Sequence, residues 1–247
     1  MRPPSGGRRR LGPLPVAPEA GPGGLPDRRV SLRPLAVRRL GTVSYPDGLA
    51  LQERLVLERR AGDIPDTLLL LEHPHVITLG SGSDPEHVLA GPDRRADLGI
   101  ELFETGRGGD VTYHGPGQLV GYPILALEEE RRDLHRYLRD LEAALIDALA
   151  ALGVRGEPSA GMTGVWVGGG KIAAIGVRVS SGWITSHGFA LNVSTDLRYF
   201  DTIVPCGIAD LPVTSLEREL DRPAPMAEVE TAVCGALASR LGRALVD

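Results

Sequence analysis

Hydrophobic residues recur at helical spacing in three parts of this chain. Along residues 133–153 they are separated by three or four positions, at Leu134, Leu138, Leu141, Leu145, Leu149 and Leu152. This spacing predicts a helix with one apolar face, and Gly153 suits the position just after its end. Similar patterns predict a helix over residues 47–60 and a last helix from about Met226 to Leu245. One face of the last helix would carry Val229, Val233, Leu237 and Leu241.

Strand-like patterns occupy most of the remaining chain. Residues 66–80 contain an apolar run, a break at His73-Pro74 and then a short strand. Further strand segments are predicted over residues 100–109, 110–127, 164–179 and 182–194. Residues 164–179 contain a triple-glycine turn between two apolar stretches, which indicates a hairpin. Because helices and strands alternate irregularly, we expect an α+β (α/β) fold with a mixed, largely antiparallel sheet.

Composition separates the start of the chain from the rest. The net charge is −5, yet residues 1–39 contain nine Arg and only two acidic residues. The remainder is therefore acidic, which argues against general nucleic-acid binding. Residues 1–35 are rich in Arg, Pro and Gly, so we expect a disordered extension before a single catalytic domain over residues 36–247.

The sequence also restricts where the protein works. It has no apolar run of about 18 residues and no apolar signal segment, so neither a membrane span nor secretion is expected. Its two cysteines, Cys206 and Cys234, do not form a disulfide framework. A cytoplasmic, reducing location is the expectation.

Two residues are candidates for covalent chemistry. Of 27 basic residues, Lys171 is the sole Lys. Lys can lose its proton where Arg effectively cannot, although chance could also leave one Lys in an Arg-rich chain. Cys206 lies in the loop sequence VPCG, where its neighbours favour access, and a nearby Lys would stabilise its thiolate. Cys234 lies on the apolar face of the last helix, which indicates a small core residue.

The six histidines suggest two kinds of site. His73 and His75 could form a zinc site with His114, His187 and Cys206, but neither HExxH nor a paired CxxC is present, so no metal is expected. His114 and His187 each precede a glycine. A backbone N–H left open there would suit carbonyl or oxyanion stabilisation, and the alternative is a hydrogen-bonded structural histidine. His87 and His135 are expected at the surface.

Four segments in order resemble one enzyme family. They are RGGDVTYHGPGQLVGYP (107–123), GGGKIAAIGVRV (168–179), SHGFALNV (186–193) and IVPCG (203–207). Together they resemble the lipoyl (octanoyl) transferases of lipoate biosynthesis over roughly residues 36–220. The resemblance implies the fold of biotin and lipoate protein ligases, a mixed sheet flanked by helices.

The resemblance also implies an activity and its participants. The enzyme would take an octanoyl group from octanoyl-acyl carrier protein and pass it to a lysine of a lipoyl domain. Those domains would belong to 2-oxoacid dehydrogenase complexes and to the glycine cleavage H protein. No cofactor is implied. The many glycines of residues 107–123 would let the backbone approach the acyl chain and its carrier arm.

Site residues follow from the resemblance position by position. Cys206 matches the acyl-thioester nucleophile, and Lys171 matches the lysine that lowers the pKa of this cysteine. The substrate-binding segments correspond to Arg107, Gly108, Gly109, Asp110, Val111, Thr112, Tyr113, His114, Ala174, Ile175, Gly176, His187, Gly188 and Phe189.

Three other functions compete with this one. An ATP-dependent lipoate or biotin ligase would share the fold, but its glycine-rich motif differs and it needs no cysteine. A non-catalytic acyl-binding protein would be expected to lose Cys206 or Lys171, and both are present. A zinc hydrolase is the third alternative, which metal analysis would test.

Overall fold

The computed structural model describes residues 32–205 and 211–246. The expected disorder of the N-terminal extension falls on residues 1–31, outside the described residues, and so does everything expected of Cys206. Strand β1 (Arg33–Thr42) begins two residues before residue 35, near which the folded part was predicted to start.

Three long helices are present where the apolar spacing predicts them. They are α1 (Tyr45–Ala61), α3 (Leu134–Ala151) and α5 (Met226–Leu241). The predicted end of the last helix at Leu245 is wrong. Gly242 adopts a left-handed conformation with φ of 65° and ends α5, after which strand β11 (Arg243–Val246) begins. The short elements α2 (Pro92–Asp97), α4 (Leu216–Leu220), η1 (Pro85–His87), η2 (Glu129–Arg131) and η3 (Leu197–Thr202) were not predicted.

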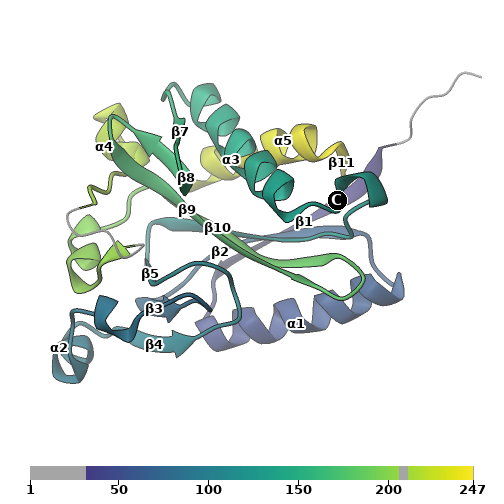
Figure 1. The fold of residues 1–247 in the computed structure, drawn as a ribbon. Helices are drawn as coiled ribbons and strands as arrows, with labels where there is room; N and C mark the ends of the chain where they lie inside the picture. Colours follow the sequence, from purple (N-terminus) through teal and green to yellow (C-terminus); the bar gives the residue numbers. More distant parts are fainter. Residues whose placement is uncertain (1–31, 206–210, 247) are drawn as a thin grey trace, which may run out of the picture. The chain divides into compact units, whose positions relative to one another are not determined.

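The main sheet has eight strands in the order β11-β1-β2-β6-β10-β9-β8-β7 (Figure 1). Besides β1 and β11, its strands are β2 (Asp66–Glu72), β6 (Gln118–Ile124), β7 (Glu157–Ser159), β8 (Met162–Val167), β9 (Gly170–Ser180) and β10 (Ile184–Asn192). Only the pairings of β1 with β11 and with β2 are parallel. The sheet is therefore mixed and largely antiparallel, and β8 and β9 form the predicted hairpin.

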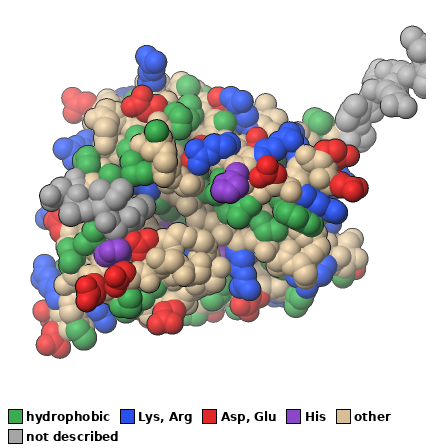
Figure 2. Space-filling view, in the orientation of Figure 1, with side chains coloured by type: hydrophobic (Ala, Val, Ile, Leu, Met, Phe, Trp, Pro, Cys, Tyr) green, Lys and Arg blue, Asp and Glu red, His purple; other side chains and the backbone are tan. Residues whose placement is uncertain are grey.

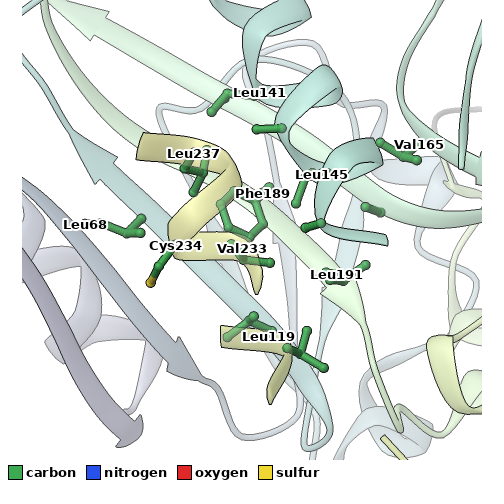
Figure 3. Packing of buried hydrophobic residues seen from close by; sticks show 14 of the residues in the cluster. Leu68, Leu119, Leu141, Leu145, Val165, Phe189, Leu191, Val233, Cys234 and Leu237 are labelled. Carbon is green, nitrogen blue, oxygen red and sulfur yellow. The ribbon is translucent and has the colours of Figure 1, made fainter. Parts of the chain in front are cut away.

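Helices cover both faces of this sheet. Strand β2 has four successive leucines, and successive side chains of a strand point to opposite faces. Leu68 and Leu70 pack in the core under α3 and α5, whereas Leu69 and Leu71 pack against α1. Figure 3 shows the first of these cores, in which Cys234 on α5 is buried as predicted. The continuous apolar run of β2 therefore reflects burial on both sides.

A smaller sheet stands beside the main one, with the order β4-β3-β5. Its strands are β3 (Val76–Leu79), β4 (Glu101–Glu104) and β5 (Thr112–His114). The segment 110–127 was predicted as one stretch of strand, but the structure divides it between the two sheets. Gly117, with φ of 78°, makes the turn between β5 and β6, and its N–H donates to the Glu72 carboxylate at 2.6 Å. Because of this division, β5 of the small sheet and β6, β9 and β10 of the main sheet all contribute residues to the site described below.

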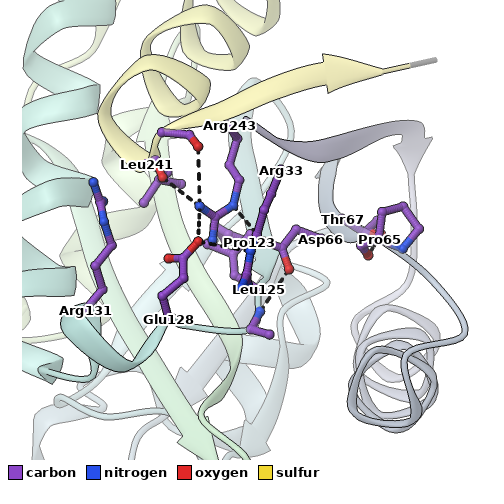
Figure 4. A network of polar contacts seen from close by, with 12 residues as sticks. Arg33, Pro65, Asp66, Thr67, Pro123, Leu125, Glu128, Arg131, Leu241 and Arg243 are labelled. Atoms are coloured by element: carbon purple, nitrogen blue, oxygen red, sulfur yellow. Dashed lines mark hydrogen bonds and ion pairs between the residues drawn. The ribbon is translucent and has the colours of Figure 1, made fainter. Parts of the chain in front are cut away.

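Ions are buried at the end of β2 and β6 remote from this turn (Figure 4). The Arg243 guanidinium contacts Asp66 at 2.7 Å and Glu128 at 2.9 Å, and Arg59 contacts the other Asp66 oxygen at 2.7 Å. The side chains of Arg243 and Asp66 are 3% and 1% exposed. We call Asp66, Glu128, Arg243, Arg59 and the more exposed Arg33 the ion cluster.

The surface charges and the helices can be compared with two sequence-based expectations, that the protein is not a general nucleic-acid binder and that it has no membrane span. Figure 2 shows acidic and basic side chains interspersed over one face, unlike the continuous basic surface that nucleic-acid binding uses. Within residues 32–205 and 211–246, no helix combines the length and apolarity that crossing a bilayer demands.

Candidate active site

A cavity of about 420 Å³ lies where the first turn of α1, the strands β5, β6, β9 and β10 and the loop after η3 converge. Among the predicted site residues, those lining it are Lys171, Arg107 to Thr112, His114, Ala174 to Gly176, and His187 to Phe189. Segments 60 residues or more apart in the sequence therefore contribute to one cavity. We call it the acyl cavity below.

Tyr113 is the described residue of the predicted set that does not line this cavity. Its hydroxyl lies 2.7 Å from His75 Nδ1, and its ring stacks on that of Tyr199 at 5.3 Å between centroids. Strand alternation explains the difference, because Thr112 and His114 lie on the face of β5 opposite to Tyr113. Tyr113 therefore helps to hold η3 against the small sheet.

Lys171 is buried, with 6% of its surface exposed. Its ammonium lies 5.1 Å from the centroid of the Trp166 ring, a cation–π distance. Space beside it is limited, because a Cβ added at Gly164 would lie 2.7 Å from Lys171 Cε. The predicted tight space is therefore present, and Gly164, on the neighbouring strand, contributes to it.

The backbone of Lys171 is hydrogen-bonded to the chain that follows residues 206–210. Its N–H donates to the Pro212 carbonyl at 2.8 Å, and its carbonyl accepts from Thr214 N–H at 3.0 Å. Val213 and Pro205 also line the acyl cavity. The chain on both sides of residues 206–210 thus reaches the cavity that contains Lys171.

His114 and His187 are buried and uncharged near neutral pH. Burial, with His73 nearby, lowers the pKa of His114 to about 3, and burial with Arg107 nearby lowers the pKa of His187 to about 4. Neither imidazole is therefore a cationic anchor or a reservoir of protons at neutral pH.

Hydrogen bonds fix the orientation of His114. Gln118 donates its amide N–H groups to the Asn192 side-chain oxygen and to the Tyr113 carbonyl, so its Oε1 is the atom 2.8 Å from His114 Nδ1. In neutral His114 the Nδ1–H donates to Gln118 and Nε2 is an acceptor. The side chain can therefore accept an N–H from a substrate but cannot donate to an oxyanion.

His187 departs from expectation in a different way. Its backbone N–H donates to Gln52 Oε1 at 2.7 Å, so this group is not open to a ligand as predicted. Its φ of 55° is unusual for a side chain with a Cβ, and such conformations persist only where the surrounding structure imposes them. Gln52, on α1, supplies part of that constraint.

Arg107 lines the cavity next to strand β3 of the small sheet. Its guanidinium donates to the Thr78 carbonyl at 2.6 Å and to the Thr78 hydroxyl at 2.8 Å. It is 7% exposed, and its charge is among the causes that depress the pKa values of both cavity histidines. Arg107 therefore makes this part of the cavity electropositive.

The glycines of the cavity wall are required by contacts inside the protein. A Cβ at Gly176, which lines the cavity, would lie 2.8 Å from the Gly108 carbonyl oxygen. Behind the wall, a Cβ at Gly121 would overlap the Phe189 ring. Gly108 and Gly109, from the segment expected to let the backbone approach the acyl chain, do line the cavity, and that expectation stays a prediction. Small residues here allow the strands and the loop 107–111 to pack closely.

Asp110 and His87 form a pair at the cavity wall. Asp110 Oδ2 lies 2.7 Å from His87 Nδ1, and the His87 carbonyl accepts from Val204 N–H at 2.8 Å. The side chain of His87 is 28% exposed, so it is less of a surface residue than predicted, whereas His135 is exposed. Asp110 Oδ1 is buried and has no hydrogen-bond partner among the described residues.

The remaining histidines have separate partners. His73 Nδ1 donates to the Val43 carbonyl at 2.7 Å, which leaves Nε2 to accept from the Tyr122 hydroxyl at 2.8 Å. His75 contacts Tyr113 instead. Over the described parts of the chain, no three His, Cys, Asp or Glu side chains are grouped so that they could hold a metal ion.

Several lining residues were not predicted. Gln118 and Asn192 lie within the quoted motif segments, so their polar character in strand positions was the available signal. Tyr45 comes from the start of α1, where its ring stacks on Phe103 at 5.4 Å and on His114 at 6.3 Å. Nothing in the spacing of residues around Tyr45 indicates that it reaches this cavity.

Comparison with known proteins gives close relatives. The family model described as the lipoyl protein ligase A/B catalytic domain matches residues 44–238. An octanoyltransferase of Rubrobacter xylanophilus is 55% identical over 220 residues, which cover 88% of this chain and 97% of that protein. An octanoyltransferase of Chloroflexus aggregans is 52% identical over 200 residues, covering 80% of this chain and 90% of that one.

Solved structures of similar fold are more distant in sequence. Lipoate-protein ligase A bound with ATP superposes with a TM-score of 0.65 at 16% identity, covering 88% of this chain and 90% of that one. A bipartite lipoate protein ligase from Thermoplasma acidophilum gives a TM-score of 0.64 at 16% identity, with 88% of each chain covered. These likenesses confirm the predicted fold class.

Proposed function

We propose a specific route of octanoyl transfer for this chain, which belongs to the lipoyl protein ligase A/B catalytic domain family. As a member of that family it is an acyltransferase that moves octanoyl groups in protein lipoylation. The donor is octanoyl-acyl carrier protein, the nucleophile is Cys206, and the acceptor is a lysine of a lipoyl domain. Acceptor proteins include 2-oxoacid dehydrogenase complexes and the glycine cleavage H protein.

One observation carries the choice of catalytic residues. Lys171, the sole lysine of the chain, is buried at a cavity that is also lined by Pro205, and Cys206 is the next residue in sequence. Consecutive Cα atoms are about 3.8 Å apart. This connectivity supports a Cys206–Lys171 pair.

The walls of the acyl cavity suit an octanoyl chain. Ala173, Ala174, Ile175, Phe189 and Val213 contribute apolar surface to it. Burial of a methylene group contributes about 0.8 kcal/mol, so a chain of this length is a substantial source of binding free energy.

The first half of the reaction acylates the enzyme. The Cys206 thiolate, stabilised by the Lys171 ammonium, attacks the carbonyl carbon of the donor thioester, and a new C–S bond forms. The bond to the carrier sulfur breaks. The departing thiolate takes a proton from Lys171, which leaves an octanoyl enzyme, a carrier thiol and a neutral Lys171.

The second half transfers the octanoyl group to nitrogen. The acceptor ammonium loses one proton to Lys171, and the resulting amine attacks the Cys206 thioester. A C–N bond forms, the C–S bond breaks, and the second surplus proton leaves to solvent. Lys171 is again protonated and Cys206 is again a thiolate, so the cycle is closed.

Intact-mass measurement tests this route. After mixing with octanoyl-acyl carrier protein, the enzyme should gain one octanoyl mass, and hydroxylamine should remove it. Cys206→Ser should show no such adduct. Cys234→Ser is the matched control, because Cys234 is buried in the helix core and should leave acylation intact. An adduct of unchanged yield on Cys206→Ser would contradict the assignment.

The energy source separates this route from the ligase alternative. A thioester donor already contains an activated acyl group, so transfer to a lipoyl domain should proceed without ATP or magnesium. Strict dependence on ATP with free octanoate as the donor would instead favour an ATP-dependent ligase.

A further inference from the structure

Asp110 differs from every other described residue of the acyl cavity. It is the one carboxylate among the described residues that line the cavity, whereas Arg107 and Lys171 are both cations. The two cavity histidines add no charge near neutral pH. Once Lys171 has given up its proton in the first half of the proposed reaction, an incoming cation would be repelled by Arg107 and attracted by Asp110, the one anionic side chain among these residues.

The hydrogen bonds of Asp110 leave one of its oxygens available. Oδ2 accepts from His87 Nδ1 at 2.7 Å, which orients the carboxylate. Oδ1 is withdrawn from solvent and has no partner among the described residues. A buried carboxylate oxygen without a donor is costly, so a site of this kind favours a ligand that supplies an N–H.

His87 also links this carboxylate to the segment that leads to Cys206. Its carbonyl accepts from Val204 N–H at 2.8 Å, two residues before Cys206. His87 therefore holds Asp110 through its side chain and Val204 through its backbone.

The chemistry of the reactants indicates which N–H donor fits. A carboxylate accepts hydrogen bonds and forms its strongest ones with cations. In the proposed reaction the acceptor lysine is the reactant whose reacting group is a cation, whereas the donor presents an uncharged thioester. The carboxylate also offsets the repulsion that Arg107 would exert on that ammonium.

We infer that Asp110 binds the ammonium group of the acceptor lysine through Oδ1, with His87 holding the carboxylate in position. This inference rests on the proposed function and concerns only its second half. Asp110 is a binding residue for the acceptor, and His87 is a positioning residue that acts through Asp110.

The test separates loading of the enzyme from its discharge. Wild-type enzyme, Asp110→Asn and the control Glu86→Gln are each loaded with octanoyl-acyl carrier protein, and the yield is read by intact mass. Asn is isosteric and keeps an acceptor for His87, while Glu86 is an exposed carboxylate next to His87. The rate of discharge is then measured over a range of lipoyl-domain concentrations, and separately with hydroxylamine, which is uncharged near neutral pH.

For Asp110→Asn we expect normal loading and normal discharge by hydroxylamine. The lipoyl-domain concentration that gives half-maximal discharge should rise by about 10- to 100-fold, the loss expected for a hydrogen bond between charged groups. His87→Phe should raise the same concentration by less, and Glu86→Gln should behave like wild type.

Two outcomes would overturn the inference. If Asp110→Asn loaded poorly but discharged at normal lipoyl-domain concentrations, Asp110 would serve the donor. If hydroxylamine and the lipoyl domain were affected equally, no recognition of the ammonium would remain. A wild-type enzyme that acquires no octanoyl mass would instead contradict the proposed function itself.

Discussion

Two buried polar groups of residues lie at opposite ends of β2 and β6, and they use their charges differently. In the ion cluster, Asp66 accepts from Arg59, Arg243 and the Ala126 N–H, so its carboxylate is surrounded by donors. In the acyl cavity, Asp110 contacts one described donor, and the histidines are held neutral. Both oxygens of Asp66 have donors within the protein. Glu128 Oε2 and Asp110 Oδ1 are both buried without a partner among the described residues, but of the two residues only Asp110 lines the cavity, where a substrate can supply a donor.

The difference shows how buried polarity can be assigned to structure or to function. Removing one partner from a buried ion pair leaves an uncompensated charge, so the ion cluster should report on stability. Histidines with shifted pKa values and a buried lysine beside a cavity are typical of an active site. Changes in the two places should therefore affect different measurements.

The largest effect should come from Lys171→Arg in the acyl cavity. Arg retains a positive charge but cannot exchange a proton, and it is bulkier beside Gly164. We expect octanoyl transfer to a lipoyl domain to slow by about 100- to 10,000-fold, the usual contribution of a general acid–base group. If the variant kept most of the wild-type rate, proton exchange at this position would be excluded. Lys171→Ala should in addition slow alkylation of Cys206 near neutral pH.

In the ion cluster, Arg243→Ala should lower the free energy of unfolding by about 3–5 kcal/mol. It would leave Asp66 and Glu128 without their shared guanidinium. Denaturant unfolding measures the loss, and the transfer rate per folded molecule should be unchanged. In the double variant with Asp66→Asn, the loss should be smaller than the sum of the single losses. A large fall in rate without loss of stability would remove the distinction between the two regions.

The neutral histidines predict how stability depends on pH. The pKa of His187 is about 4 in the folded protein and about 6.5 when unfolded, so below about pH 6.5 the unfolded chain binds the extra proton. Stability should be full above this pH and fall by about 1.4 kcal/mol per unit, for this residue, down to about pH 4. His187→Asn should flatten this slope in unfolding curves, since Asn tolerates the positive φ. An unchanged slope would show that His187 is not buried neutral.

The smallest effect should come from the N-terminal boundary. A variant lacking residues 1–31 keeps Arg33, whose Nε lies 3.3 Å from Glu128 and whose side chain is 49% exposed. Its melting temperature and transfer rate should match those of the full chain. Removal of residues 1–34 would delete this exposed pair, worth about 0–1 kcal/mol, and also the first two pairings of β1 with β11. A large loss in the shorter truncation would show that the Arg-rich segment contributes to the fold or the reaction.

Local patterns in the sequence were sufficient for much of the fold. The leucine spacing of α3 and the apolar face of α5 predicted helices, and the triple glycine predicted the hairpin of β8 and β9. Errors arose where a single turn redirected the chain. Gly242 ended α5 early, and Gly117 assigned β5 and β6 to different sheets, because pairing partners far along the sequence determine where a strand goes.

The residues of the candidate site likewise fall into those that a local sequence pattern predicted and those that only tertiary contacts revealed. The residue counts and motif segments singled out Lys171, Cys206 and the segments that contain Arg107, His114 and His187, since each has a local signature. Asp110 was included only as one position within a motif. Its pairing with His87, and the contribution of Tyr45, depend on contacts between elements that no local pattern records.

The sequence by itself therefore determined the family, the fold class, the long helices and the residue types available for chemistry. The tertiary structure decided which histidines are neutral, that Gly176 packs against the Gly108 backbone, and that Tyr113 faces away from the cavity. The physical reason is that periodicity and motifs are properties of neighbouring residues. Burial, desolvation and the direction of a side chain arise only when distant strands are placed side by side.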